Sequence, residues 1–110
     1  MFDKSQLLKG ILEGCILKYI KSQPAYAYGA IVYLKEKGFT ELTEGTLYPL
    51  LLRLERQKLI YSELKASSFG PKRKYYYITE EGELYLNDFE REYFSLDKIV
   101  KNILENKDES

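Results

Sequence analysis

Apolar residues recur every three or four positions along the first part of the chain, and this spacing predicts an amphipathic helix from about Ser5 to Ser22. Pro24 ends that segment. Gly10 and Gly14 lie one helical turn apart within it. Glycine in a helix interior costs about 1 kcal/mol relative to alanine, so we expect another element to pack closely against these two positions. The apolar stripe consists of Leu8, Ile11, Leu12, Cys15, Ile16, Tyr19 and Ile20.

Two further helices are predicted in the first half of the chain. One spans about residues 27–37 and has a basic last turn followed by Gly38, which is a common ending signal. The next begins at Thr43, whose hydroxyl can accept a hydrogen bond from a free backbone N–H group, and extends to about Gln57. This helix has two distinct faces. One face carries Leu47, Leu50, Leu51 and Leu54. The opposite face carries Gly45, Pro49, Leu52 and Arg56, flanked by Tyr48 and Arg53.

The segment after this helix predicts a β-hairpin. Residues 59–66 and 73–78 are rich in Ile, Leu and Tyr, and residues 67–72 between them include the Gly and Pro that turns require. Because side chains alternate along a strand, Tyr76 and Ile78 share one face of the second strand. We expect that face to pack on the helices. The other face, with Arg73, Tyr75 and Tyr77, should carry the basic group.

A long helix follows, capped by Thr79 and running from Glu80 to about Asn106. Its apolar residues alternate in steps of three and four, as in the seam of a coiled coil. At 1.5 Å per residue the helix would be about 40 Å long, which exceeds what a domain of this size covers. Part of the seam should therefore meet a second copy of the chain. The predicted dimer contacts are Leu86, Phe89, Tyr93, Leu96, Val100 and Ile103.

The order of three helices, a hairpin and a long helix is typical of a winged helix-turn-helix domain with an added dimerisation helix. The predicted fold is thus mainly α with a β-hairpin wing. Residues 1–79 would form the DNA-binding domain, and residues 80–110 the dimerisation helix and a short tail. Since the second helix of such a motif enters the major groove, a double-stranded DNA operator is the predicted partner of a homodimer.

The start of the third predicted helix provides the first candidate DNA contacts. Free N–H groups at Glu44 and Gly45 suit a phosphate, and the Thr46 hydroxyl suits a phosphate or a base. Arg53 or Arg56 could neutralise the DNA backbone.

The hairpin provides three consecutive cations, Lys72, Arg73 and Lys74, beside tyrosines. A run of three basic residues is in other contexts often only a solvated surface. On a hairpin that directly follows a helix-turn-helix, the same run favours contact with phosphates or with the adjacent minor groove.

Composition excludes several classes of protein. Without histidine and with a single cysteine, Cys15, the chain offers neither an imidazole base nor a thiolate zinc site or internal disulfide. It also lacks the glycine-rich motifs that bind nucleotides. We therefore expect no enzymatic activity, no metal and no cofactor, and we interpret Cys15 as a small core residue. Because uncharged runs are far shorter than the roughly 18 residues of a membrane span, we expect a cytoplasmic protein without a membrane partner.

Charge is divided between the two predicted parts. The chain as a whole has 17 basic and 17 acidic residues, which taken alone disfavours nucleic-acid binding. However, residues 1–79 hold 13 cations against 7 acids, whereas residues 80–110 hold 4 against 10. The pattern indicates a basic DNA-binding part and an acidic dimerisation helix.

Three stretches of the sequence resemble the PadR family of bacterial transcriptional regulators in its short form. The resemblance implies a homodimeric winged-helix repressor with no enzymatic activity. It adds Tyr28, the segment from Thr43 to Tyr48, and Arg73 as DNA contacts. The stretches are Leu8-Lys9-Gly10 with Tyr26-Ala27-Tyr28, then Gly45-Thr46-Leu47-Tyr48-Pro49-Leu50-Leu51 with Arg53-Leu54-Glu55, and Gly70-Pro71-Lys72-Arg73-Lys74-Tyr75-Tyr76 with Ile78-Thr79 and Gly82.

The sequence departs from the family pattern at two places. The family often has Gly-Tyr-Glu where this chain has Ala27-Tyr28-Gly29, and a lysine where it has Leu52.

Some short PadR-like regulators bind flat aromatic drugs between protomers, against a tryptophan of the last helix. Tyr93 occupies that position here, with Asp97 one turn on, so the resemblance implies a planar aromatic or phenolic effector as a further partner. Tyr93 also falls on the seam, and plain dimer packing is the competing interpretation.

A second hypothesis is a winged-helix module that binds a protein and no DNA. Leu52 on the presumed DNA face and Phe69 at the tip of the wing favour it. Leu52 has two interpretations, as a contact to a thymine methyl or as an exposed leucine under the wing loop.

Overall fold

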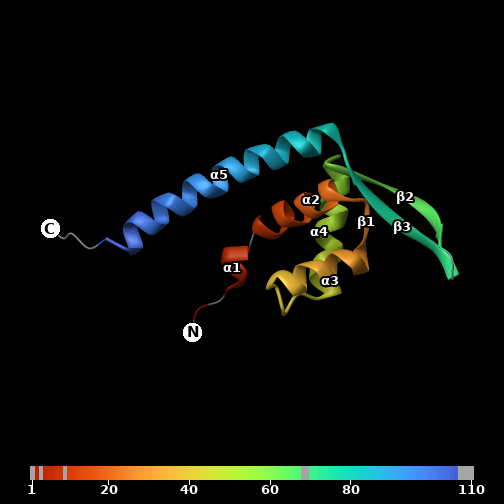
Figure 1. Cartoon of the computed structure of the whole chain (residues 1–110), viewed down its shortest axis with the longest axis horizontal. Helices are drawn as coiled ribbons and strands as arrows, with labels where there is room; N and C mark the ends of the chain where they lie inside the picture. The colour runs from red at the N-terminus through yellow and green to blue at the C-terminus, as the bar shows by residue number, and fades with distance from the viewer. Residues whose placement is uncertain (1, 3, 9, 68–69, 107–110) are drawn as a thin grey trace.

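A computed structural model describes residues 2, 4–8, 10–67 and 70–106 of the chain (Figure 1). The helices that precede the hairpin form a small head, the hairpin projects from one side of it, and the last helix crosses the head and extends beyond it on the other side. This arrangement confirms the predicted winged helix-turn-helix with a long C-terminal helix. The elements in order are α1 (Ser5–Leu8), α2 (Ile11–Ser22), β1 (Ala25–Tyr26), α3 (Ala27–Lys37), α4 (Glu44–Arg56), β2 (Ile60–Ser67), β3 (Gly70–Ile78) and α5 (Glu80–Leu104).

The first predicted helix is interrupted. Gly10 has φ 82° and ψ −28°, a left-handed conformation that separates α1 from α2, so the prediction of one continuous helix was wrong at this point. Apart from its chain neighbours, no residue in the described ranges has an atom within 4 Å of where a Cβ of Gly10 would be. Gly14 behaves as expected, because a Cβ there would lie 2.2 Å from a ring carbon of Phe89. Close packing against α5 therefore explains Gly14 but not Gly10.

The sheet contains a strand that the sequence pattern did not predict. The two-residue strand β1 pairs antiparallel with β3, and the strand order is β1-β3-β2. The second hairpin strand is also longer than predicted, since β3 begins at Gly70 and not at Arg73, whereas β2 has the predicted length but lies one residue later. Phe69, which was expected at the wing tip, lies outside the described residues.

The core lies between the helices and the inner face of the sheet. Tyr76 of β3 packs into it, as the alternation of side chains predicted. Leu86 of α5 also belongs to this core, because only 1 % of its surface is exposed in the single chain. This corrects the placement of Leu86 in the dimer seam. The largest fully buried side chains are Ile16, Leu17, Leu34, Leu47, Leu51, Leu54, Ile60 and Leu86.

A compact junction joins α4, the wing and α5. The Thr79 hydroxyl accepts a hydrogen bond from the N–H of Gly82 at 2.9 Å, which confirms the predicted cap of α5. The same hydroxyl donates its proton toward two carbonyl oxygens, that of Lys58 at 2.7 Å and that of Leu59 at 3.0 Å. The start of α5 is thus fixed to the turn that follows α4. None of the helices in the described ranges is long and apolar enough to cross a membrane.

Candidate nucleic-acid interface

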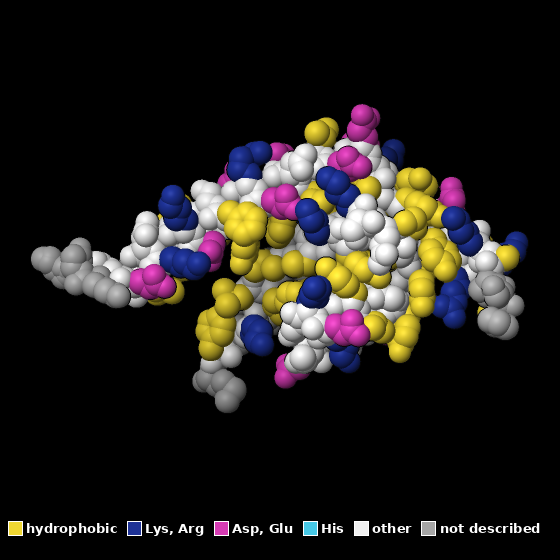
Figure 2. Space-filling model, in the orientation of Figure 1, with side chains coloured by type: hydrophobic (Ala, Val, Ile, Leu, Met, Phe, Trp, Pro, Cys, Tyr) yellow, Lys and Arg dark blue, Asp and Glu magenta, His cyan; other side chains and the backbone are white. Residues whose placement is uncertain are grey.

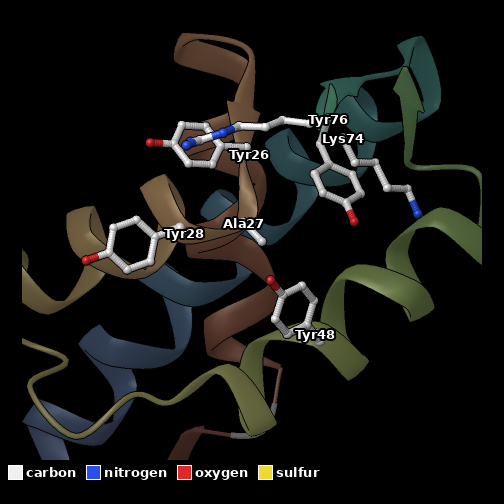
Figure 3. Close-up of a pocket in the computed structure, with 7 residues that line it drawn as sticks. Tyr26, Ala27, Tyr28, Tyr48, Lys74 and Tyr76 are labelled. Atoms are coloured by element: carbon white, nitrogen blue, oxygen red, sulfur yellow. The ribbon is translucent and has the colours of Figure 1, made fainter. Parts of the chain in front are cut away.

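A hollow of about 350 Å³ opens between the start of α3, the outer side of α4 and the wing (Figure 3). Four of the residues predicted to contact DNA line it, and they come from three separate segments: Tyr28, Tyr48, Arg73 and Lys74. Tyr26, Ala27 and Tyr76 complete the lining. The fold therefore brings the candidate residues of α3, α4 and the wing to one surface.

Strand β1 sets the geometry of this hollow. Pairing of Ala25 with Tyr76 and of Tyr26 with Tyr75 attaches the chain to β3 immediately before α3 begins. Tyr28 is consequently exposed in the first turn of α3, beside the wing. Tyr48 projects into the hollow from α4 on the other side (Figure 3). Sequence patterns missed Tyr26, because a strand of two residues is too short to show alternation.

Arg73 is held against an aromatic ring. Its guanidinium carbon lies 4.7 Å from the centroid of the Tyr26 ring, a distance typical of a cation–π contact. Within the described ranges Arg73 makes no ion pair. Stacking orders the side chain without neutralising it, so its charge stays available to a phosphate.

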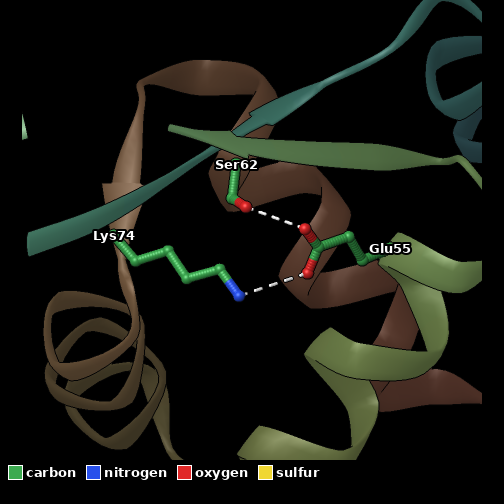
Figure 4. Close-up of polar contacts among 3 residues, drawn as sticks. All are labelled: Glu55, Ser62 and Lys74. Carbon is green, nitrogen blue, oxygen red and sulfur yellow. Dashed lines mark hydrogen bonds and ion pairs between the residues drawn. The ribbon is translucent and has the colours of Figure 1, made fainter. Parts of the chain in front are cut away.

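Lys74 is different, because its charge is shared with α4. Its ammonium lies 3.5 Å from one oxygen of Glu55, whose other oxygen accepts a hydrogen bond of 2.7 Å from Ser62 (Figure 4). These contacts connect β2, β3 and α4. Burial raises the pKa of the hydroxyl of Tyr76, which lines the same hollow. We conclude that Lys74 anchors the wing as well as adding charge to the hollow.

The start of α4 differs from the prediction in one respect. Thr43 occupies the N-cap position, but its hydroxyl accepts no hydrogen bond from a backbone N–H and instead lies 3.4 Å from the Thr46 hydroxyl. Glu44 and Gly45 follow, and all four residues are exposed. The N–H of Thr46 donates to the Thr43 carbonyl oxygen, and no side chain caps the helix, so the N–H groups of Glu44 and Gly45 remain free for an acceptor such as a phosphate oxygen. Thr46 borders a separate hollow between α1, α2 and residues 37–42, away from the wing.

Both faces of α4 are placed as predicted. Leu47, Leu51 and Leu54 are buried, and Leu50 is half-buried. The opposite face is exposed and carries Gly45, Pro49, Leu52 and Arg56. Lys72 is also exposed, on the wing.

Arg53 does not join the residues of the hollow. Its Nε atom lies 3.4 Å from Oε2 of Glu13 on α2, and Glu13 is only 4 % exposed. That oxygen has no hydrogen bond within the described part of the chain, so Arg53 provides the charge that balances it. The pair attaches α4 to α2, a role that the sequence pattern did not indicate.

Replacing Arg53 by alanine should lower the free energy of unfolding by about 1–2 kcal/mol, because a buried carboxylate would lose its counter-charge. Urea unfolding at a fixed protein concentration would measure the change. Arg91→Ala is the matched control, since the ion pair of Arg91 with Asp88 is about two-thirds exposed on both sides. That control should change stability by less than about 0.5 kcal/mol. Equal effects of both variants would contradict a structural role for the Glu13 pair.

Beyond Phe89, α5 leaves the head with its apolar side uncovered. The aromatic rings of Phe89, Tyr93 and Phe94 follow one another, with centroids 6.0 Å and 5.4 Å apart. Asp97, the second residue of the implied effector site, forms an ion pair with Lys101 at 3.3 Å. Tyr93 and Asp97 thus lie one turn apart, as expected, but part of the Asp97 charge is already compensated. The exposed apolar side chains in this part of α5 are Tyr93, Phe94, Leu96, Ile99, Val100, Ile103 and Leu104.

Comparison with known proteins gives a consistent result. The model of the transcriptional regulator PadR-like family matches residues 16–88. A crystal structure of a PadR-like transcriptional regulator from Bacillus cereus is 48 % identical, with a TM-score of 0.82 over 90 % of this chain and 96 % of that one. A PadR family regulator from Eggerthella lenta is 34 % identical, with a TM-score of 0.83 over 93 % and 88 % of the two chains.

One curated relative, an uncharacterised protein of Lysinibacillus sphaericus, is 30 % identical over 104 residues, which is 93 % of this chain and 95 % of that protein. The family model covers more than half of the chain and includes α3, α4 and the wing, the three elements that line the hollow. The chain therefore belongs to the PadR-like family of transcriptional regulators, which are not enzymes.

Proposed function

We propose that the chain is a homodimeric, sequence-specific DNA-binding regulator that represses transcription. The observation that carries this proposal is the hollow at which α3, α4 and the wing meet. There Tyr28 and Tyr48 offer hydroxyl groups, and Arg73 offers a charge that no described acid neutralises. Hydroxyls and guanidinium groups are the side chains that bind DNA phosphates, which suits a surface where the second helix of the motif enters the major groove.

The residues proposed to contact DNA extend from this hollow along α4 and the wing. Glu44 and Gly45 would present free N–H groups to a phosphate, and Thr43 and Thr46 would present hydroxyl groups. Lys72 would extend the charge of the wing. We assign Arg53 a smaller part in DNA binding than Arg73, because the buried Glu13 already pairs with it. The proposed set is Tyr28, Thr43, Glu44, Gly45, Thr46, Tyr48, Arg53, Lys72, Arg73 and Lys74.

A second copy of the chain is the proposed partner of α5. The exposed apolar side chains of this helix continue the stripe that Leu86 and Phe89 begin on the head. Figure 2 shows hydrophobic side chains along the side of α5 that faces the head and on the adjoining surface of the head. In the proposed division of roles, residues 1–79 bind DNA and residues 80–110 pair the two copies. Phe89, Tyr93, Leu96, Val100 and Ile103 would form the interface.

Release from the operator by a planar aromatic or phenolic effector is part of the same proposal. The sequence places that effector between the two copies, at Tyr93 and Asp97. Exposed aromatic surface at Tyr93 and Phe94 supports stacking of a flat ligand. Such an effector would act by binding more tightly to a dimer whose two DNA-binding surfaces have the wrong separation for the operator.

DNA binding is tested by the salt dependence of the affinity for the promoter region of the chain's own gene. Replacing Lys72, Arg73 and Lys74 by alanine removes up to three phosphate contacts per protomer. The slope of log K against log salt should become less steep by about 2 to 5 for the dimer, because each neutralised phosphate contributes about 0.9. Fluorescence anisotropy of labelled duplexes would measure both the slope and the affinity.

The control for this experiment is the triple alanine variant at Arg91, Lys98 and Lys101. These exposed cations of α5 carry the same total charge but lie outside the proposed DNA-binding surface. Their loss should leave the slope nearly unchanged. If both triple variants behaved alike, the wing would not contact DNA. Absence of binding by the unmodified chain at low salt would instead favour the alternative of a winged-helix module that binds a protein partner.

A further inference from the structure

The outward face of α4 carries an unusual set of side chains for a helix that enters a DNA groove. Its exposed residues between the first and last turns are Pro49 and Leu52, with Gly45 before them and Arg56 after them. Glycine has no side chain and proline has no hydrogen-bonding group. Leu52, half of whose surface is exposed (51 %), is therefore the longest side chain in the middle of this face.

Two of the polar side chains near Leu52 on α4 have partners within the protein, whereas Tyr48, one turn before Leu52, lines the hollow. Arg53 pairs with the buried Glu13, and Glu55 binds Ser62 and Lys74. Both contacts direct the polar groups to the sides of the helix, toward α2 and toward the wing. Between Gly45 and Arg56 the outward face itself carries only Pro49 and Leu52, whose side chains have no hydrogen-bond donor, and the Tyr48 hydroxyl lies at its edge.

A base edge can be recognised without hydrogen bonds only through its apolar part. In the major groove that part is the C5 methyl group of thymine, which distinguishes A·T pairs from G·C pairs. Arg56 is exposed one turn after Leu52 and makes no ion pair within the described residues. Its charge is available to a phosphate beside the groove, which would hold Leu52 against the bases.

We propose that Leu52 is a specificity-determining residue that contacts thymine methyl groups, so that the operator carries thymine opposite the middle of α4. This proposal rests on the proposed DNA binding and names the bases that the same surface prefers. Contact with a methyl group removes apolar surface from water on both partners, so its loss should weaken binding by about three- to fivefold for each thymine.

The test begins with operator sequences selected by the unmodified protein from a pool of random duplexes. Each thymine of the selected half-site is then replaced by deoxyuridine, which removes the methyl group and leaves the hydrogen-bonding pattern intact. Affinity should fall by about three- to fivefold at one or two positions. Leu52→Ala should bind the thymine operator more weakly by a similar factor and should respond little to deoxyuridine at the same positions.

Leu84→Ala is the matched control, because Leu84 is a similarly exposed leucine (62 %) on α5. It should keep the full response to deoxyuridine. If the unmodified protein bound thymine and deoxyuridine operators equally, or if Leu52→Ala kept the full response, the role of Leu52 would be excluded while salt-dependent DNA binding still stood. Failure to bind any duplex at low salt would overturn both this proposal and the proposed function.

Discussion

Gly82→Ala is expected to lower the free energy of unfolding by about 2–4 kcal/mol, since added bulk at a close-packed site forces the backbone to move. A Cβ at this position would lie 2.1 Å from the carbonyl oxygen of Leu59. That oxygen accepts hydrogen bonds of 3.0 Å from the N–H and from the hydroxyl of Thr79. The carbonyl cannot retreat without lengthening both bonds. Thermal or urea unfolding at a fixed protein concentration would measure the loss.

Gly45→Ala is the matched control for this prediction. Gly45 is also a helical glycine, but the nearest heavy atom to its added Cβ would be the Thr43 hydroxyl oxygen at 3.7 Å, an ordinary contact distance. Alanine has the higher helix propensity, so this variant should be as stable as the unmodified chain or up to about 1 kcal/mol more stable. Similar stability of the two variants would show that the junction at Gly82 tolerates a displacement of Leu59.

The junction at Gly82 matters because it determines the direction of α5. Thr79 and Gly82 are fixed to Lys58 and Leu59, which end the turn after α4. Phe89 then packs on Gly14 of α2, so α5 is attached to the head at two separate points. In a dimer paired through α5, these two attachments would set the distance between the two α4 helices. A regulator that reads two half-sites depends on that distance.

The architecture was predictable because long elements with strong periodicity determine it. The bounds of α3 agree with the prediction. Those of α4 differ from it by one residue at each end, and α5 ends two residues earlier than predicted. Apolar side chains at helical spacing, the cap at Thr79 and the ending at Gly38 all indicated the same structure. Such segments can be predicted from a single sequence because their local signals agree with the tertiary packing.

Short-range features were less predictable, for physical reasons. An apolar stripe continues through Gly10, so the pattern gave no sign that the glycine adopts a left-handed conformation there. Strand β1 has two residues and depends on pairing with β3, a contact distant in sequence. Thr43 has the usual N-cap residue type, yet its hydroxyl lies beside that of Thr46. In each case the outcome depends on neighbours that a local pattern does not contain.

The candidate site also combines residues that the sequence predicts with contacts that it does not. Residue types and positions along the motif selected Arg73 and Lys74, and the resemblance to the PadR family added Tyr28 and Tyr48. The fold brings all four together. The sequence could not show that Glu13 forms an ion pair with Arg53, because the spacing of residues along the chain does not relate a buried acid of α2 to an arginine of α4. It also placed Leu86 in an intermolecular seam, although the head itself buries that residue. Heptad spacing identifies an apolar stripe but does not say which part of the stripe its own domain covers.

Leu96→Asp should convert the proposed dimer into monomers and reduce operator affinity by about 10²- to 10⁴-fold. Leu96 is 59 % exposed in the single chain and lies in the middle of the uncovered stripe, where a carboxylate would have to be buried against apolar side chains of a second copy. Loss of pairing removes the gain in affinity that comes from binding two half-sites at once. Sedimentation velocity would give the oligomeric state, and anisotropy with a full and a half operator would give the affinities.

Leu84→Asp provides the control for charge and exposure. Leu84 is 62 % exposed but lies on the opposite side of α5 from the stripe, so the same substitution there should leave the dimer intact. Because Leu96 makes no contribution to the buried core of the head, the Leu96→Asp chain should stay folded and keep its helical circular dichroism. A Leu96→Asp protein that sedimented as a dimer would exclude this stripe as the interface. A monomeric Leu96→Asp protein that bound the full operator as tightly as the unmodified chain would instead separate DNA binding from dimerisation, and each α4 would then have to recognise its site alone.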